Sequence, residues 1–242
     1  MTKNTVNLDA AIMAEIHEHA KREYPRESCG LVVIRKGRYK YIPVRNIAEK
    51  DQDFLMDPEG QAAAEDIGEV ALVVHSHPTT PPIPSEADLV WCERSGLPWL
   101  IINTLTGSTH QFAPSGYQAP LYGRTFSHGI LDCYSFIQDY YKRELGIVLP
   151  NFERSGEWWL KGQNLYLEGF EAAGFVKVDG PPKLHDGLLM RVASPVPNHG
   201  AIYLGEGLIG HHQMGRLSSR DVYGGWYNTV TVAVLRHKGA EN

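Results

Sequence analysis

The chain has 242 residues, 43% of them hydrophobic, and a formal net charge of −5, so we expect a packed core in one or two domains. This charge implies no broad basic face, which argues against nucleic acid as the main partner, and no apolar run approaches the roughly 18 residues of a membrane span. Three scattered cysteines are too few for a disulfide framework, so we expect a protein made and kept in a reducing cytosol.

The first part of the chain alternates between helical and strand-like patterns, which indicates an α/β or α+β domain over residues 1–113. Helices are indicated by apolar residues at helical spacing and by cap signals such as Asp57-Pro58. Strands are indicated by runs of β-branched residues, and a proline-rich loop follows the third of them. The expected helices cover residues 8–24, 59–67 and 85–94, and the expected strands cover 31–34, 39–44, 70–74, 99–102 and 109–113.

The second part begins after residues 114–123, which contain two prolines and two glycines without periodicity and are predicted to be a linker. In the predicted domain over 124–242, helices come first and strands follow, which is typical of an α+β fold. The expected helices cover residues 133–145, 158–169 and 170–173, and the expected strands cover 188–192, 200–204, 208–211 and 229–235.

A cluster of metal-ligand residue types lies at the end of the third predicted strand. His75 and His77 are two residues apart in an extended segment, so their side chains point to the same side. Asp88 follows three residues after Ser85, where a helix is expected to begin. Two imidazoles and a carboxylate are a normal ligand set for catalytic zinc. Ser85 and Asp88 also form a common helix-capping pattern, and the two interpretations are compatible.

The pattern H-x-H-P-x6-S-x-x-D resembles the motif of the JAMM (MPN+) metallopeptidases. These proteins also place a glutamate at the start of the strand after the first helix, and Glu27 occupies that place here. The resemblance covers residues 8–113 and implies a three-layer domain with a mixed sheet. It implies that Glu27 is the general base and that Ser85 helps to hold the oxyanion. The implied ligands of one zinc ion are His75, His77 and Asp88.

Cys133 stands at the start of the first helix expected in the second domain. A buried cysteine on an apolar face is usually part of the core, but the positive end of a helix lowers the pKa of a thiol. A cysteine nucleophile also needs a base, normally histidine, and the base needs an orienting partner. The downstream candidates are His185, His199, His211 and His212.

The segment Asp132-Cys133-Tyr134-Ser135, followed by the strand His199-Gly200-Ala201-Ile202-Tyr203-Leu204-Gly205, resembles the NlpC-type peptidoglycan cysteine peptidases. The resemblance implies a papain-like α+β domain in which Cys133 is the nucleophile, His199 the base and His211 the orienting residue. His212 remains the alternative to His211. Upstream of the cysteine, Leu121-Tyr122-Gly123-Arg124 retains only part of a tyrosine motif of that family, so an oxyanion role for a tyrosine stays open.

A JAMM-type unit followed by an NlpC-type unit resembles the tail tip assembly protein K family of lambda-like bacteriophages. This resemblance implies a bifunctional hydrolase that acts on peptidoglycan peptides and on a peptide or isopeptide bond of a protein, with phage tail tip proteins as partners. It implies a role in tail assembly or cell-wall penetration, in the host cytoplasm during assembly or in the virion tail tip. Two alternatives stay open: an assembly or scaffold factor with vestigial sites, and a bacterial ubiquitin-like deconjugase with a wall-targeting module.

Overall fold

The structure is a computed structural model that describes residues 5–51, 53–154 and 156–240. The chain divides into two units, Met1–Gln118 and Ala119–Asn242. The terminal residues of the two predicted domains, 1 and 242, lie outside the described residues. None of the helices in these described ranges has both the length and the apolar composition of a membrane-spanning segment.

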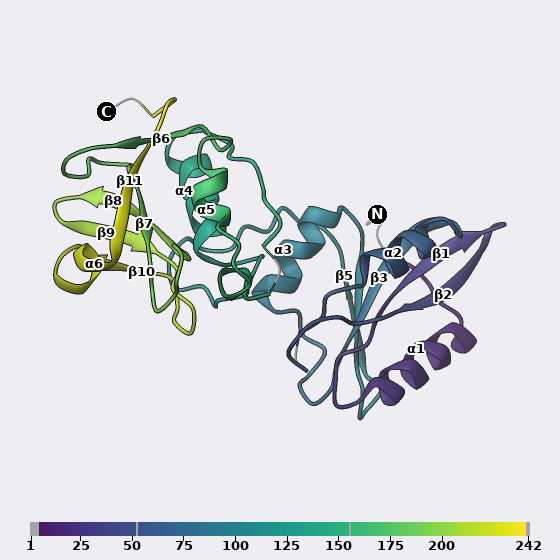
Figure 1. The fold of residues 1–242 in the computed structure, drawn as a ribbon. Helices are drawn as coiled ribbons and strands as arrows, with labels where there is room; N and C mark the ends of the chain where they lie inside the picture. Colours follow the sequence, from purple (N-terminus) through teal and green to yellow (C-terminus); the bar gives the residue numbers. More distant parts are fainter. Residues whose placement is uncertain (1–4, 52, 155, 241–242) are drawn as a thin grey trace. The chain divides into compact units, whose positions relative to one another are not determined.

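The first unit is built on a mixed five-stranded sheet, as predicted. Its strands lie in the order β2-β1-β3-β4-β5 (Figure 1). β3 and β4 are parallel, and the other neighbouring pairs are antiparallel. Its elements are α1 (Ala10–Glu23), β1 (Cys29–Arg35), β2 (Arg38–Val44), α2 (Pro58–Glu65), β3 (Glu69–His77), α3 (Glu86–Ser95), β4 (Trp99–Asn103) and β5 (Thr109–Phe112).

Helices cover both faces of this sheet, because successive side chains of a strand point to opposite faces. On one face, Leu72 packs in a buried cluster with Ile16 of α1. On the other face, the next residue of β3, Val73, packs with Ala64 of α2 and Cys92 of α3. The result is the three-layer arrangement that the resemblance to the JAMM metallopeptidases implies.

The second unit is built on an antiparallel six-stranded sheet, and its main helix precedes all of the strands in the sequence. The strand order is β10-β9-β8-β7-β11-β6, and α4 packs against β8 (Figure 1). The elements are α4 (Cys133–Glu144), a 3₁₀ turn (Trp158–Leu160), α5 (Leu165–Gly169), β6 (Phe175–Val178), β7 (Gly187–Met190), β8 (His199–Gly205), β9 (Leu208–His211), β10 (Ser219–Val222), α6 (Gly225–Val230) and β11 (Thr231–His237).

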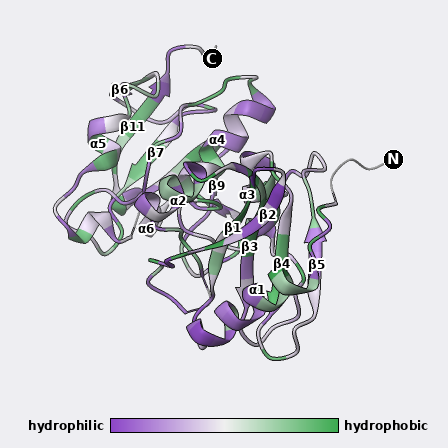
Figure 2. Ribbon diagram, turned by 90° about the vertical axis from the view of Figure 1, so that its right-hand side faces the viewer, coloured by the Kyte–Doolittle hydropathy of each residue, from purple (hydrophilic) through white to green (hydrophobic). Residues whose placement is uncertain are grey.

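Two buried clusters lie on the two faces of this sheet. Phe136 and Tyr141 of α4 pack with Ile202 on one face, and the neighbouring Ala201 packs on the other face with Tyr227 of α6. Figure 2 shows the hydrophobic colour along β11 of this unit and along β4 of the first unit. The helix-then-strand order of the second unit confirms the prediction of an α+β domain.

Several local predictions for the second unit are wrong. Residues 158–169 do not form a continuous helix, because Gly162 has a φ of +77°, a left-handed conformation that a right-handed helix cannot include. Residues 170–173 form a turn rather than a helix. The short strands β6 and β10 were not predicted, and residues 229–230 end α6 instead of starting the last strand.

Candidate functional site

The first group of candidate residues lies where β3 ends and α3 begins. His75 and His77 belong to β3, and Asp88 lies in the first turn of α3. One potential ligand atom from each of these three side chains lies within 4.8 Å of the other two. The fold therefore brings together the three residues that the sequence pattern marks as metal ligands.

His75 is completely buried, and neither of its ring nitrogens has a hydrogen-bond partner within the described residues. Phe54 stacks on the ring at a centroid distance of 4.5 Å, and Trp99 meets it edge-on at 5.6 Å. Burial lowers the pKa of His75 to about 4, so the ring is neutral, which is the form that binds a metal. Since buried polar atoms are normally paired, this unpaired imidazole fits the position of a metal ligand.

His77 presents its other nitrogen to the same place. Its Nδ1 atom lies 2.8 Å from the carbonyl oxygen of Pro81. Because a carbonyl oxygen only accepts, Nδ1 carries the proton, and Nε2 is left with its lone pair. The next carbonyl upstream, that of Thr80, accepts a hydrogen bond of 2.7 Å from the Asn103 side chain. Asn103 thus holds the loop that follows β3, and this loop fixes the ring orientation of His77 through the Pro81 carbonyl group.

Ser85 and Asp88 form a reciprocal cap at the start of α3. The Ser85 hydroxyl oxygen accepts from the Asp88 backbone N–H at 3.1 Å. The Oδ2 atom of Asp88 accepts from the Ser85 N–H at 2.7 Å and from its hydroxyl at 2.8 Å. The capping interpretation is therefore correct, and it leaves Oδ1 facing His75. The Ser85 hydroxyl donates its proton to Asp88. Ser85 can therefore donate a hydrogen bond to an oxyanion only after its hydrogen bond to Asp88 breaks.

Glu27 lies just before β1, on the side of the histidine pair. The antiparallel register pairs Cys29 with His75, and the same register continued by two residues brings Glu27 beside His77. The Glu27 side chain is buried, and burial, followed by the charge of Asp88, raises its pKa to about 9. A protonatable carboxyl group thus lies at the edge of the ligand group.

A side-chain hub holds the segment around Glu27 in place. The amide nitrogen of Asn46 donates to the carbonyl oxygens of Glu27 at 2.9 Å and Asp53 at 3.0 Å. Its amide oxygen accepts from the backbone N–H of Leu55 at 3.0 Å. The buried Asn46 therefore fixes the loop after β2 against the start of β1, and nothing in the local sequence indicated this role.

The second group of candidate residues surrounds the start of α4. Asp132 caps this helix, because its carboxylate accepts from the Ser135 N–H at 2.8 Å, and the Ser135 hydroxyl accepts from the Asp132 N–H at 2.7 Å. Arg154 forms a buried ion pair with Asp132, with Nε 2.9 Å from Oδ2. Cys133 is the first residue of the helix, so this cap and ion pair fix its position.

The sulfur of Cys133 is in contact with a tyrosine that the sequence did not indicate. Its Sγ atom lies 3.1 Å from the hydroxyl of Tyr166 in α5. Burial, followed by the charge of Asp132, raises the pKa of the thiol to about 11. We expected the helix start to lower this pKa, whereas burial raises it and favours the neutral thiol at neutral pH.

The two histidines come together because β8 and β9 are antiparallel neighbours. His199 begins β8 and His211 ends β9, and Nε2 of His199 lies 2.9 Å from Nδ1 of His211. Nε2 of His211 lies 3.0 Å from Oδ2 of Asp221 in β10. The hydroxyl of Tyr227 in α6 donates to the same oxygen at 2.6 Å. The structure thus builds a hydrogen-bonded chain that continues beyond the predicted third residue.

The other candidates make different contacts. The ring of His212 meets Phe126 edge-on at 5.1 Å, so it is His211 that the structure places against His199. His185 is bonded to the hydroxyl of Tyr140 at 2.8 Å. Tyr122, from the partial upstream motif, contacts the ring of Phe136 at a centroid distance of 5.6 Å.

Four residues of this second group were missed in the sequence. Asp221 lies in a strand that was not predicted, and a hairpin prediction after His211 would have found it. Two further contacts join segments that are far apart in the sequence, so no local pattern indicated them. They are the contact of Cys133 with Tyr166 and the ion pair of Asp132 with Arg154. The missed residues are Arg154, Tyr166, Asp221 and Tyr227.

Comparisons with known proteins divide the chain in the same order. Residues 9–113 match the prokaryotic homologs of the JAB domain, and residues 122–236 match the NlpC/P60 family. Tail tip assembly protein K of Escherichia phage N15 is 38% identical over 231 residues, which cover 94% of this chain and 93% of that protein.

Two further relatives match less of the chain. Tail tip assembly protein K of Escherichia phage lambda is 40% identical over 184 residues, covering 76% of this chain and 89% of that protein. The CysO-cysteine peptidase of Mycobacterium tuberculosis is 29% identical over 102 residues, covering 38% of this chain and 69% of that protein.

Proposed function

Because the chain belongs to the tail tip assembly protein K family, we propose that it is a bifunctional hydrolase of a phage tail tip. In this proposal, residues 124–242 cleave a peptide bond of peptidoglycan through Cys133, His199 and His211. Residues 1–113 cleave a peptide or isopeptide bond of a protein. The partners are other tail tip proteins, and the chain acts in the host cytoplasm during assembly, in cell-wall penetration from the virion tail tip, or in both.

The observation that carries the first activity is the 2.9 Å hydrogen bond between His199 and His211, next to a cysteine at a helix start. Because Nε2 of His199 is engaged by His211, its Nδ1 is the nitrogen available to the nucleophile. The raised pKa of Cys133 and the pKa of His199, which burial lowers to about 3, make the resting pair neutral. Proton transfer from sulfur to Nδ1 therefore accompanies the attack on the substrate.

The bonds exchange in two steps. The Cys133 sulfur attacks the carbonyl carbon, the peptide C–N bond breaks, and His199 passes the proton it received to the leaving amine. Water then attacks the thioester carbonyl carbon and gives a proton to His199. The C–S bond breaks, the carboxylic acid leaves, and His199 returns the proton to the Cys133 sulfur. Because the Asp132 cap engages the Ser135 N–H, the N–H groups of Cys133 and Tyr134 at the start of α4 are the donors that we propose for the developing oxyanion.

For the first unit we propose one zinc ion held by His75, His77 and Asp88. The unpaired nitrogens of the buried His75 support this choice. When bound, zinc lowers the pKa of water and polarises a carbonyl group. The positive charge of a bound ion would also favour the carboxylate form of Glu27, which could then accept a proton from the attacking water and transfer it to the leaving amine. The similarity of residues in this unit to a peptidase supports a peptide-like substrate.

The first activity is tested by digesting purified muropeptides with the full chain and identifying fragments by mass spectrometry. We expect release of peptide fragments by wild type and by Glu27→Ala, and none by Cys133→Ala. Cys92→Ala is the matched control, because Cys92 is a buried cysteine of the first unit. Release that survives Cys133→Ala would overturn the assignment.

The second activity is tested on a fluorogenic isopeptide substrate with and without a chelator. We expect cleavage that the chelator and Glu27→Ala abolish and that Cys133→Ala leaves unchanged. Cleavage that is insensitive to both the chelator and Glu27→Ala would exclude the first unit as its source.

A second candidate function is a tail assembly factor whose cysteine site is inactive. The observation in its favour is the neutral, buried thiol of Cys133, which is hydrogen-bonded to the hydroxyl of Tyr166. Phages carrying Cys133→Ala and, separately, His77→Ala distinguish the two. Tails that assemble and infect normally with both variants would favour the assembly factor.

A further inference from the structure

We propose that Asp221, held by Tyr227, sets the direction of the hydrogen bonds through the two histidines and so keeps His199 in the tautomer that can accept a proton from Cys133. This inference rests on the proposed function of the cysteine site. Asp221 contacts His211 and acts through it, so we describe it as a positioning residue.

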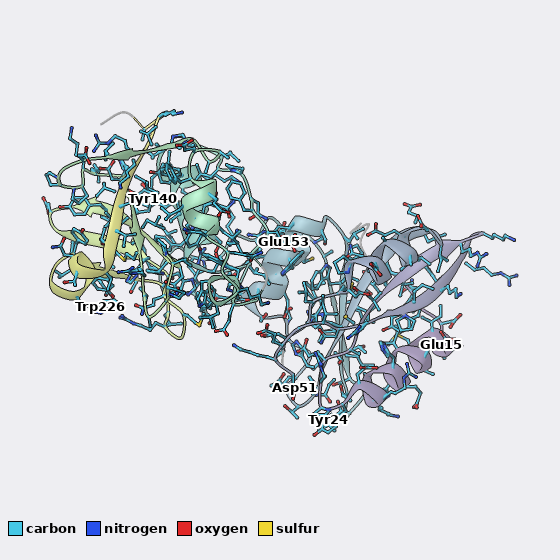
Figure 3. The ribbon with its side chains drawn as sticks, in the orientation of Figure 1. Glu15, Tyr24, Asp51, Tyr140, Glu153 and Trp226 are labelled. Carbon is cyan, nitrogen blue, oxygen red and sulfur yellow. The ribbon has the colours of Figure 1, made fainter. Side chains whose placement is uncertain are left out.

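The contacts form one uninterrupted chain across four elements. The Tyr227 hydroxyl of α6 lies 2.6 Å from Oδ2 of Asp221 in β10. That oxygen lies 3.0 Å from Nε2 of His211 in β9, whose Nδ1 lies 2.9 Å from Nε2 of His199 in β8. In Figure 3, the label on Trp226, which precedes Tyr227 in the sequence, marks the position of α6. Both histidines are buried, so the chain passes from the outer strand to the interior.

The direction of this chain follows from its first acceptor. An ionised carboxylate has no proton to donate, so Nε2 of His211 must carry one. Burial lowers the pKa values of His199 and His211, so each ring is neutral and holds one proton. Nδ1 of His211 is therefore an acceptor, Nε2 of His199 is the donor to it, and Nδ1 of His199 keeps its lone pair.

The opposite direction would have nearly the same heavy-atom geometry and would not support catalysis. If Nδ1 of His211 donated to Nε2 of His199, the single proton of neutral His199 would lie on Nδ1. That nitrogen could then not accept the thiol proton of Cys133. The distance between the two rings does not distinguish these cases, so the group at the far end of the chain decides between them.

Asp221 is held in the charged form that this role requires. Its side chain is 22% exposed, and Nη1 of Arg216 lies 3.4 Å from the same oxygen. Although partial burial raises it, the hydrogen bonds from Tyr227 and His211 lower the pKa of Asp221 below its usual value. Tyr227 also meets the ring of His211 edge-on at a centroid distance of 5.2 Å. The tyrosine thus positions both the carboxylate and the imidazole.

The direct test is nitrogen NMR of the full chain with ¹⁵N-labelled histidine, because ring nitrogens with and without a proton have distinct shifts. In wild type we expect the proton of His199 on Nε2. In Asp221→Asn, whose amide can donate as well as accept, we expect His199 to show the Nδ1-protonated form in part or in full. Asp179→Asn, at an exposed position of the same unit, is the matched control and should leave His199 unchanged.

Muropeptide kinetics provide the second readout. We expect Asp221→Asn to lower kcat by about 100-fold or more with KM within about twofold, since a wrong histidine tautomer removes the base but not the binding surface. Tyr227→Phe, which keeps the ring and loses one donor, should lower kcat by a smaller factor.

Several results would overturn the inference. A wild-type His199 with its proton on Nδ1 would do so without any variant, which matters if Asp221→Asn fails to fold. An unchanged tautomer together with an unchanged kcat in Asp221→Asn would do so as well. If wild type releases no muropeptide fragments, the proposed function fails, while the NMR comparison still decides the role of Asp221.

Discussion

The Nε2 atom of His75 lies 3.4 Å from Oδ1 of Asp88, although neither nitrogen of that ring makes a hydrogen bond to any described residue. The second oxygen of the carboxylate is engaged by Ser85 as a helix cap. The imidazole of His75 and the carboxylate of Asp88 therefore lie close together without forming a hydrogen bond. A cation between them would pair both, since neutral imidazole and carboxylate are both ligands that zinc prefers.

The first prediction concerns this ligand group. His75→Ala should reduce bound zinc from about one ion per chain to nearly none, because removal of one of three protein ligands leaves an incomplete site. Metal analysis after dialysis against buffered zinc measures the change. His110→Ala, at an exposed histidine of β5, should bind as much zinc as wild type. Equal zinc contents in the two variants would remove the basis for the site.

The second prediction concerns the buried carboxyl of Glu27 in metal-free protein. Because its folded-state pKa is about 9, above the ordinary value of 4.5, the unfolded chain releases this proton first as pH rises. The free energy of unfolding should therefore fall between about pH 4.5 and 9, and Glu27→Gln should remove this dependence. At pH 8, Glu27→Gln should raise the free energy of unfolding above that of wild type by up to about 5 kcal/mol.

Hydrogen exchange of β1 and β3 in the presence of a chelator, at pH 5 and pH 8, measures this effect within the first unit. Glu15→Gln is the control, because Glu15 is exposed on the outer side of α1 (Figure 3). No gain in stability for Glu27→Gln at pH 8 would contradict the prediction.

The third prediction concerns the reactivity of Cys133. With a thiol pKa of about 11, only the small thiolate fraction reacts at neutral pH. The rate of alkylation by iodoacetamide should therefore rise about tenfold per pH unit between pH 7 and 10. Mass spectrometry of the peptide that contains Cys133 gives the rate, with urea-unfolded protein as the reference. A rate that is already level at pH 7 would instead indicate a preformed thiolate.

The fourth prediction concerns the ion pair behind the nucleophile. Arg154→Met leaves the Asp132 carboxylate buried without its cation and removes a guanidinium that lies 4.8 Å from the ring centroid of Tyr134. The second unit should lose about 3–5 kcal/mol of unfolding free energy. Arg191→Met, at an exposed arginine of the same unit, should change it by less than about 0.5 kcal/mol. Hydrogen exchange of α4 measures both, and similar values for the two variants would refute the prediction.

Local chemistry determined much of this protein in advance. The continuous run of buried apolar residues before His75 and the cap at Ser85 depend only on near neighbours, so the sequence predicted both the strand and the helix. The start of α4 at Cys133 follows from the Asp132 cap in the same way. The break at Gly162 was missed because a left-handed glycine leaves no periodic signal.

Tertiary structure alone decided the electrostatics and the partners. The pKa of Cys133 depends on how completely distant segments remove water from it, so helix position could not predict its direction. Asp221 and Tyr227 reach His211 only through the pairing of β9 with β10 and the packing of α6. Hydrogen bonds and desolvation act over a few ångströms in space, whatever the separation along the chain, whereas sequence patterns report only what lies within a few residues.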